Sequence, residues 1–90
     1  MPRNASPQDD FYRSYVRRLV KDTKADAAMT YEDLADALRK NGVHIDAQVL
    51  TNRINRGAFT LAFAFQLFAA LGIDSIEIPG PPRGLKRIKR

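Results

Sequence analysis

The chain has 90 residues, of which 44% are hydrophobic and 28% charged, and it contains no cysteine. This length fits one domain, and the absence of cysteine excludes a disulfide scaffold and thiolate chemistry. The net charge of +5 is carried by residues 83–90, so residues 1–82 sum to zero. If the folded part binds a polyanion, it must do so through local patches.

The sequence also lacks signals for a membrane or for export. No apolar run approaches the roughly 20 residues that a membrane span needs. The N-terminal sequence MPRNASPQDD lacks the apolar core of a signal peptide. We therefore expect a cytoplasmic protein, and one associated with the nucleoid if it binds DNA.

The first expected element is an amphipathic helix that follows a flexible start at residues 1–8. Asp9 or Asp10 opens this helix, because acidic side chains favour its positive end. An apolar side and a basic ridge then repeat at helical spacing. The apolar side comprises Tyr12, Tyr15, Val16, Leu19 and Thr23, and the ridge comprises Arg13, Arg17, Lys21 and Lys24.

A second helix is expected to begin after Thr30, which acts as its N-cap with Asp33 completing a capping box. Asn41 and Gly42 end it, because glycine readily adopts the left-handed conformation of a C-terminal cap. The buried stripe of this helix comprises Tyr31, Leu34, Ala35 and Leu38.

A third helix is expected from the N-cap Asp46 to Arg56, with Gly57 ending it. Ala47, Leu50 and Ile54 face inward at helical spacing. The outward side carries asparagine and arginine, and no carboxylate balances the arginines. An ordinary solvated face favours Lys, Glu and Gln, so this composition indicates a function, although a solvated surface remains the alternative.

Thr60 is expected to cap a fourth helix, LAFAFQLFAAL, which carries no charge and ends at Gly72. A helix that is apolar nearly all round is rarely left in water. The first helix or a second copy of the chain must therefore cover it. The inward stripe comprises Leu61, Ala64, Phe65, Phe68 and Leu71, while Phe63 and Leu67 spread the apolar surface to the side.

A short strand pattern follows at residues 75–79, where Ile76 and Ile78 alternate around Glu77. Too little chain lies nearby to build a sheet, and pairing with a second copy is one solution. The predicted self-association residues are Phe63, Leu67, Ile76 and Ile78. Residues 80–90 then form a flexible basic tail.

Residues 31–73 resemble the Cro and phage-repressor type of helix-turn-helix. The order LADAL, a glycine, a polar helix ending in RINRG and an apolar helix ending in ALGI carries the resemblance. TYEDLADAL with LTNRINRGAFTLAFAFQLFAALG is also similar to an uncharacterised bacterial domain-of-unknown-function family in which YxxLA, RGxF and ALG recur. The connection before the third helix is about three residues longer than the usual repressor turn.

This resemblance implies an all-α fold, a compact four-helix, lambda-repressor-like helix-turn-helix domain at residues 9–79. A short C-terminal extended segment and the basic tail complete the chain. The third helix would be the recognition helix, because side-chain amides pair with the adenine edge and arginine pairs with guanine or phosphate. The predicted base-reading residues are Gln48, Thr51, Asn52 and Asn55. The predicted phosphate-binding residues are Arg13, Arg17, Arg53, Arg56, Lys86, Arg87, Lys89 and Arg90.

These features predict a sequence-specific DNA-binding protein, a small bacterial or phage-type transcriptional regulator that binds double-stranded DNA as a homodimer. The alternative is a protein-interaction or assembly module with a repressor-like fold that does not read DNA. The zero charge of residues 1–82 and the uncharged fourth helix favour that alternative. RNA binding ranks third, because exposed aromatic platforms are lacking. The basic ridge and the tail also fit a purely solubilising role.

Enzymatic activity has the least support. The sequence contains no recognisable catalytic grouping, phosphate-cradling glycine loop or nucleotide fingerprint. His44 is the single histidine, and a metal site would need ligands that the chain does not offer. We therefore expect no catalysis, no cofactor, no metal and no membrane association, and a structural or phosphate-contacting role for His44.

Overall fold

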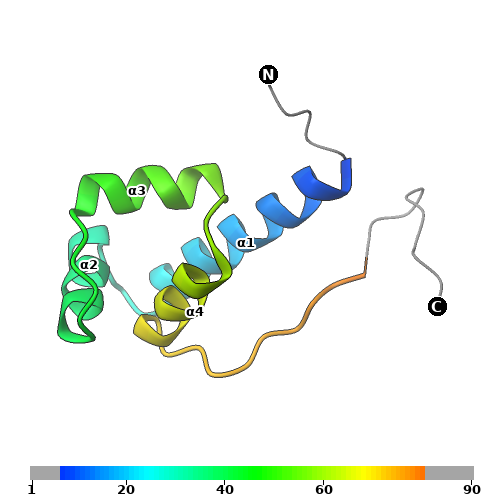
Figure 1. The fold of residues 1–90 in the computed structure, drawn as a ribbon. Helices are drawn as coiled ribbons and strands as arrows, with labels where there is room; N and C mark the ends of the chain where they lie inside the picture. The colour runs from blue at the N-terminus through cyan, green and yellow to red at the C-terminus, as the bar shows by residue number, and fades with distance from the viewer. Residues whose placement is uncertain (1–6, 81–90) are drawn as a thin grey trace, which may run out of the picture.

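Residues 7–80, which the computed structural model describes, contain four helices joined by short connections (Figure 1). The helices are α1 (Pro7–Asp26), α2 (Tyr31–Lys40), α3 (Ala47–Arg56) and α4 (Leu61–Ala70). No strand occurs between residues 7 and 80, which confirms the expectation of an all-α four-helix domain. The basic residues predicted in the tail, 83–90, lie outside the described residues.

Helix α1 begins at Pro7, earlier than the predicted start at Asp9 or Asp10. Proline fits there because the first turn of a helix does not use its backbone N–H groups, and because the proline φ is already helical. Asp9 and Asp10 lie in the first turn, where they favour the positive end of the helix dipole, as predicted. The helix ends at Asp26, and Ala28 follows with a left-handed φ of 57°.

Helix α2 begins with the predicted capping box. The Asp33 N–H donates to Thr30 Oγ1 at 3.0 Å, and the Thr30 N–H donates to Asp33 Oδ2 at 2.9 Å. Hydrogen bonds from the Thr30 backbone, and then from its side chain, hold the pKa of Asp33 below its ordinary value of 3.8. The helix ends at the C-cap Asn41, as the sequence predicts.

Helices α3 and α4 also begin and end close to the predicted residues, but their N-caps differ. Asp46 occupies the N-cap position of α3 without any side-chain capping bond. Thr60 caps α4 by accepting a hydrogen bond from the Phe63 N–H at 3.1 Å. Gly57 ends α3 in the left-handed conformation, with φ 65°.

The core draws on all four helices. Its fully buried members are Val20, Leu34, Leu38, Leu50, Ile54 and Leu67. The inward stripes of α2 and α3 are confirmed, because Leu34, Ala35 and Leu38, and then Leu50 and Ile54, are buried. Val20 is buried on α1, although the predicted apolar side of that helix does not include it.

The predicted inward stripe of α4 is confirmed only in part. Ala64, Phe68 and Leu71 are buried, as predicted. Phe63 and Leu67, which were predicted to take part in self-association, are buried in the core, so that part of the prediction is wrong. Leu61 and Phe65, which were predicted to face inward, are mainly exposed. Helical periodicity locates the inner side of a helix only when the outer side is polar. Because α4 has no charged residue, the pattern does not specify which apolar side faces inward.

The segment after α4 crosses back towards the N-terminal half of α1 (Figure 1). Residues 73–80 form neither helix nor strand, so the predicted strand at residues 75–79 is wrong for the single chain. Two tyrosines of α1 hold the segment instead. The Tyr12 hydroxyl donates to Pro79 O at 2.8 Å, and the Tyr15 hydroxyl donates to Glu77 O at 3.1 Å.

Between residues 7 and 80, no helix combines the length and the apolar character that crossing a membrane requires.

Candidate nucleic-acid interface

Three side-chain amides stand clear of the core along the outer side of α3. Gln48, Asn52 and Asn55 are all exposed, and we call them the amide ridge. None of the three makes a side-chain hydrogen bond within the described residues. They lie at helical spacing opposite the buried Leu50 and Ile54, which fix the rotation of α3. The ridge is therefore open along one side of a well-anchored helix.

Thr51 differs from the amide ridge. Thr51 is half-buried, and its hydroxyl donates a hydrogen bond to the Ala47 carbonyl at 2.8 Å. This is the common bond of a helical threonine to the carbonyl four residues earlier. The Thr51 hydroxyl already has a partner inside its own helix, unlike the three amides.

Helices α1 and α3 approach each other near the C-terminal end of α3, and each contributes two arginines to these segments. Arg17 of α1 donates from Nη1 to the Asn55 carbonyl at 2.8 Å and from Nη2 to Ser14 Oγ at 3.2 Å. This contact places α1 beside the last turn of α3, where the helix dipole favours positive charge. We call Arg13, Arg17, Arg53 and Arg56 the arginine cluster.

The members of the arginine cluster differ in how firmly they are held. The Arg53 guanidinium lies over the Phe63 ring, 5.1 Å from its centroid, and the residue is half-buried. Arg13 forms an ion pair with Asp9 at 3.5 Å, while Arg56 is exposed. Arg17 and Arg53 are thus oriented by protein contacts, and Arg56 extends into solvent next to the amide ridge.

A close backbone contact sets the position of α1 against the end of α3. A Cβ atom built on Gly57 would lie 2.8 Å from the Arg13 carbonyl oxygen. The left-handed φ of 65° independently favours glycine at this residue. The sequence marks Gly57 only as the end of a helix. The contact with α1 joins residues far apart in the chain, and no local pattern signals it.

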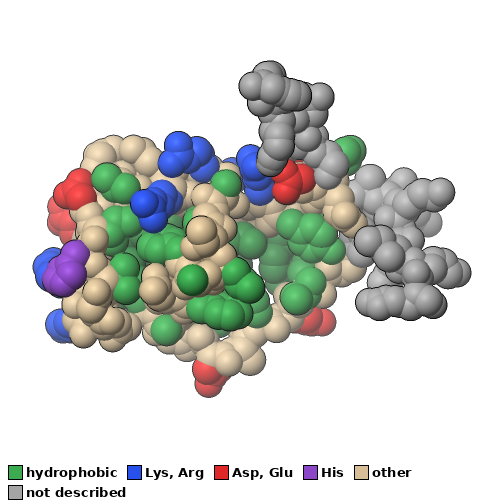
Figure 2. Space-filling view, in the orientation of Figure 1, with side chains coloured by type: hydrophobic (Ala, Val, Ile, Leu, Met, Phe, Trp, Pro, Cys, Tyr) green, Lys and Arg blue, Asp and Glu red, His purple; other side chains and the backbone are tan. Residues whose placement is uncertain are grey.

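Charge is distributed unevenly over the described residues. Residues 7–80 contain nine basic and ten acidic side chains, which gives a net charge of −1. Lys and Arg side chains nevertheless gather over α3 and the adjoining part of α1 (Figure 2). His44, in the connection before α3, is exposed. The local patch that a polyanion would need is therefore present despite the balanced total.

The connection between α2 and α3 comprises residues 41–46. It is longer than the turn of three or four residues that joins the two helices of a typical helix-turn-helix. The prediction of a lengthened turn is confirmed. Gly42, with φ 89°, and the half-buried Val43 and Ile45 shape this connection and attach it to the core.

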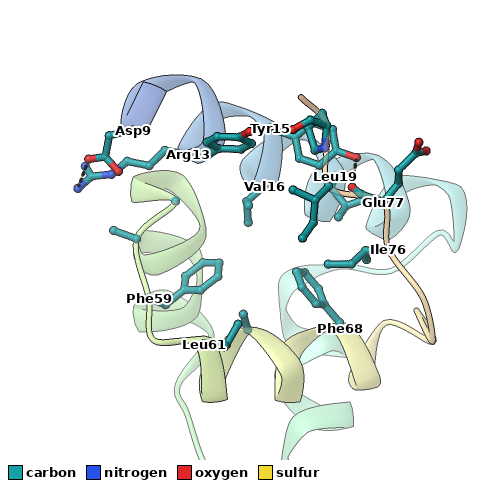
Figure 3. A pocket seen from close by; sticks show the side chains of 16 residues that line it. Asp9, Arg13, Tyr15, Val16, Leu19, Phe59, Leu61, Phe68, Ile76 and Glu77 are labelled. Atoms are coloured by element: carbon teal, nitrogen blue, oxygen red, sulfur yellow. Dashed lines mark hydrogen bonds and ion pairs between the residues drawn. The ribbon is translucent and has the colours of Figure 1, made fainter. Parts of the chain in front are cut away.

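A second surface feature lies on the α4 side. A groove of about 460 Å³ opens between the N-terminal half of α1, the start of α4 and residues 76–79. Val16, Leu19, Leu61, Phe68 and Ile76 point towards it (Figure 3). The groove is not evident from the sequence, because the pattern of the segment that forms one wall predicts a strand.

No curated protein and no solved structure matches the chain. One family model does match, over residues 12–76, and its description is Domain of unknown function (DUF6471). This span includes most of α1, all of α2, α3 and α4, and the start of the segment that crosses back to α1. The motifs YxxLA, RGxF and ALG lie inside the span. The chain belongs to the DUF6471 family, and in this chain the matched residues form the small four-helix domain.

Proposed function

We propose that this protein binds double-stranded DNA and reads its sequence with α3, as a helix-turn-helix regulator of the Cro and phage-repressor type that acts as a homodimer. The observation that carries the proposal is the amide ridge, which is exposed, without side-chain partners, and next to the arginine cluster. Exposed amides and guanidinium groups on one helix are the groups that contact base edges in the major groove.

The two groups of residues would divide the work. Gln48, Asn52 and Asn55 each offer a donor and an acceptor, which match the N6 and N7 edge of adenine. Arg17 and Arg56 would contact phosphates near the C-terminal end of α3, and such contacts position the protein without reading sequence. The C-terminal end of α3 carries the negative end of the helix dipole, which favours the positive charge of these arginines.

Selection of sites from a random DNA pool with the full chain tests this proposal. The expected result is an enriched site with two-fold symmetry, because each copy in a dimer presents one α3. Asn52→Ala is expected to weaken binding to that site by about 1–3 kcal/mol, since it removes one base contact. Binding of this variant to random DNA should stay unchanged.

Arg56→Met is the contrasting variant on the same helix. It is expected to weaken binding to selected and random DNA alike, and to lower the slope of log affinity against log salt by about 1. Equal binding of Asn52→Ala and the parent to the selected site would refute the assignment of the amide ridge. Circular dichroism should show that both variants fold like the parent.

A protein-interaction or assembly module is the second candidate. Two observations favour it: the net charge of −1 for residues 7–80 and the large apolar side chains that stay exposed on α4. A chain truncated after Pro82 distinguishes the two functions, because it removes the basic tail. Loss of all DNA binding by this truncated chain at low salt, with no enriched site from the full chain, would favour the interaction module.

A further inference from the structure

Helix α4 leaves an apolar stripe uncovered. Its outer side comprises Leu61, Ala62, Phe65, Gln66 and Ala69, and all five are exposed. Leu61 is 67% exposed and Phe65 is 59% exposed, although each could bury most of its side chain against a partner. We call Leu61, Ala62, Phe65 and Ala69 the α4 stripe. The stripe carries no charge, and α4 has none elsewhere.

The apolar surface continues from the α4 stripe onto the segment that follows α4. Ile76 is 43% exposed and Ile78 is 78% exposed. The hydroxyls of Tyr12 and Tyr15 bind backbone carbonyls of this segment and attach it to α1, so the backbone that carries Ile76 and Ile78 is held in place. Hydrophobic side chains spread over this face of the molecule in Figure 2. Continuous apolar surfaces of this kind usually mark contact sites in soluble proteins.

Three residues of the α4 stripe, Leu61, Phe65 and Ala69, are spaced symmetrically about residue 65. If two copies of α4 pack antiparallel about a two-fold axis at Phe65, each residue faces the position equally far on the other side of residue 65. Leu61 then lies opposite Ala69 of a second copy, which sets a large side chain against a small one at both ends. The two Phe65 rings then lie against each other at the axis, where they can form a favourable aromatic pair. A two-fold contact requires this match of a surface with itself.

Such a pair brings no like charges together, and it does not cover α3. The α4 stripe contains no like charges that would meet across the axis. The amide ridge belongs to α3, and its residues form no part of the stripe. In Figure 1, α3 and α4 lie on different sides of the molecule. Pairing through α4 therefore leaves both copies of α3 exposed.

We propose that a second copy of this chain covers the α4 stripe, with the two α4 helices antiparallel and Phe65 at the two-fold axis. This dimer deepens the proposed function, because it would present two copies of α3 to a symmetric DNA site. Only that role of the dimer rests on the proposed function. The apolar contact itself follows from the exposed side chains and their spacing alone.

The first test is the oligomeric state of the full chain by sedimentation velocity over a range of concentrations. The parent is expected to be a dimer. Phe65→Lys places two positive charges at the axis and is expected to raise the dissociation constant at least about 100-fold, since like charges in an interface cost several kcal/mol. Phe65 is mainly exposed, so the variant should keep the helical content of the parent.

Val49→Lys is the matched control, because Val49 is a large exposed hydrophobic residue of α3 outside the α4 stripe, with 42% exposure. It is expected to leave the dimer intact. A monomeric parent at high concentration, or a dimer that Phe65→Lys does not weaken, would overturn the proposal. Equal weakening by both substitutions would overturn it too, because α4 would then have no special role.

Disulfide formation tests the register, since the parent has no cysteine. Phe65→Cys is expected to form a covalent dimer under mild oxidation. Leu61→Cys alone is expected not to, because its counterpart lies roughly 12 Å away along the helix, beyond the reach of a disulfide. The double variant Leu61→Cys with Ala69→Cys is expected to form the covalent dimer again. Cross-linking of Leu61→Cys but not of Phe65→Cys would overturn the proposed register.

The outcomes separate this proposal from the proposed function. A dimer that depends on Phe65 but selects no DNA site would support the pairing and refute DNA reading. A monomer that selects a short asymmetric site would support DNA reading and overturn the pairing. A dimer that loses affinity for a symmetric site when Phe65→Lys is introduced, while each half-site is still bound weakly, would support both.

Discussion

Helices α3 and α4 have the same length of ten residues and pack into the same core, yet their outer sides have opposite character. The outer side of α3 carries the amide ridge and Arg56, which water solvates well. The outer side of α4 carries Leu61 and Phe65, which water solvates poorly. One core therefore supports two surfaces that suit different partners, a polar ligand on α3 and an apolar one on α4.

The junction of the two helices gives the most severe test of this comparison. Gly57→Ala is expected to lower the free energy of unfolding by about 2–4 kcal/mol, because the new Cβ would overlap the Arg13 carbonyl and because alanine disfavours a positive φ. Urea denaturation measures the change. Gly42→Ala is the control, since its φ is also positive at 89° but nothing lies within 4 Å of the added Cβ. Its expected cost is about 1 kcal/mol. Equal costs at the two glycines would show that the contact with α1 is unimportant.

The N-caps of the two helices provide a smaller contrast. Thr60→Ala is expected to cost about 1 kcal/mol, because the Thr60 hydroxyl accepts from the Phe63 N–H. Asp46→Ala is expected to cost only a few tenths of a kcal/mol, because Asp46 makes no capping bond and contributes through the helix dipole alone. Thermal or urea unfolding of the two variants side by side measures the difference. A larger loss of unfolding free energy for Asp46→Ala than for Thr60→Ala would show that Asp46, and not Thr60, is the stronger N-cap.

The far end of α3 is stabilised from outside the helix, unlike the end of α4. Arg17→Met keeps the aliphatic stem but removes the hydrogen bond to the Asn55 carbonyl, and we expect a loss of about 0.5–1 kcal/mol. Arg17→Lys should recover part of it, since lysine keeps one charged donor. Urea denaturation at low salt measures both. A loss that is identical for methionine and lysine would show that the charged contact does not matter.

The smallest expected effect concerns pH and the start of α2, which has the carboxylate that α4 lacks at the equivalent position. The folded-state pKa of Asp33 lies below 3.8, so its ionised form stabilises the fold above pH 3.8. This contribution is lost as the pH falls below 3.8 through the lowered folded-state pKa. The difference in unfolding free energy between the parent and Asp33→Asn should therefore shrink in acid. A difference that is constant with pH would exclude the ionised capping box as its source.

The sequence predicted α2 and α3 well because their signals are local. Thr30 with Asp33 marks a helix start, and Gly57 marks a helix end, whatever the rest of the chain does. The inner sides were also predictable, because polar residues opposite Leu50 and Ile54 fix the rotation of α3. The exposed position of the amide ridge followed from the same pattern.

The remainder depends on contacts between residues far apart in the sequence. The inner side of α4 was predicted only in part, because Phe63 and Phe65 are equally apolar, and only packing against α2 and the rest of the core decides which of them is buried. The bonds from Tyr12 and Arg17 to distant backbone carbonyls have no periodic signature. Alternation around Glu77 is typical of a strand, but a strand needs a neighbour that the single chain does not supply.

The contact of Gly57 with the Arg13 backbone has a geometric consequence for any pair of these chains. Because Gly57 has no side chain, the backbone of α1 packs directly against the connection between α3 and α4 and restricts the angle between these two helices. A pair formed through α4 would then hold its two copies of α3 at a fixed separation and angle. Such a pair would tolerate changes of base at the centre of its target far better than the insertion of a single base pair there, because an insertion both separates and rotates the two halves of the target.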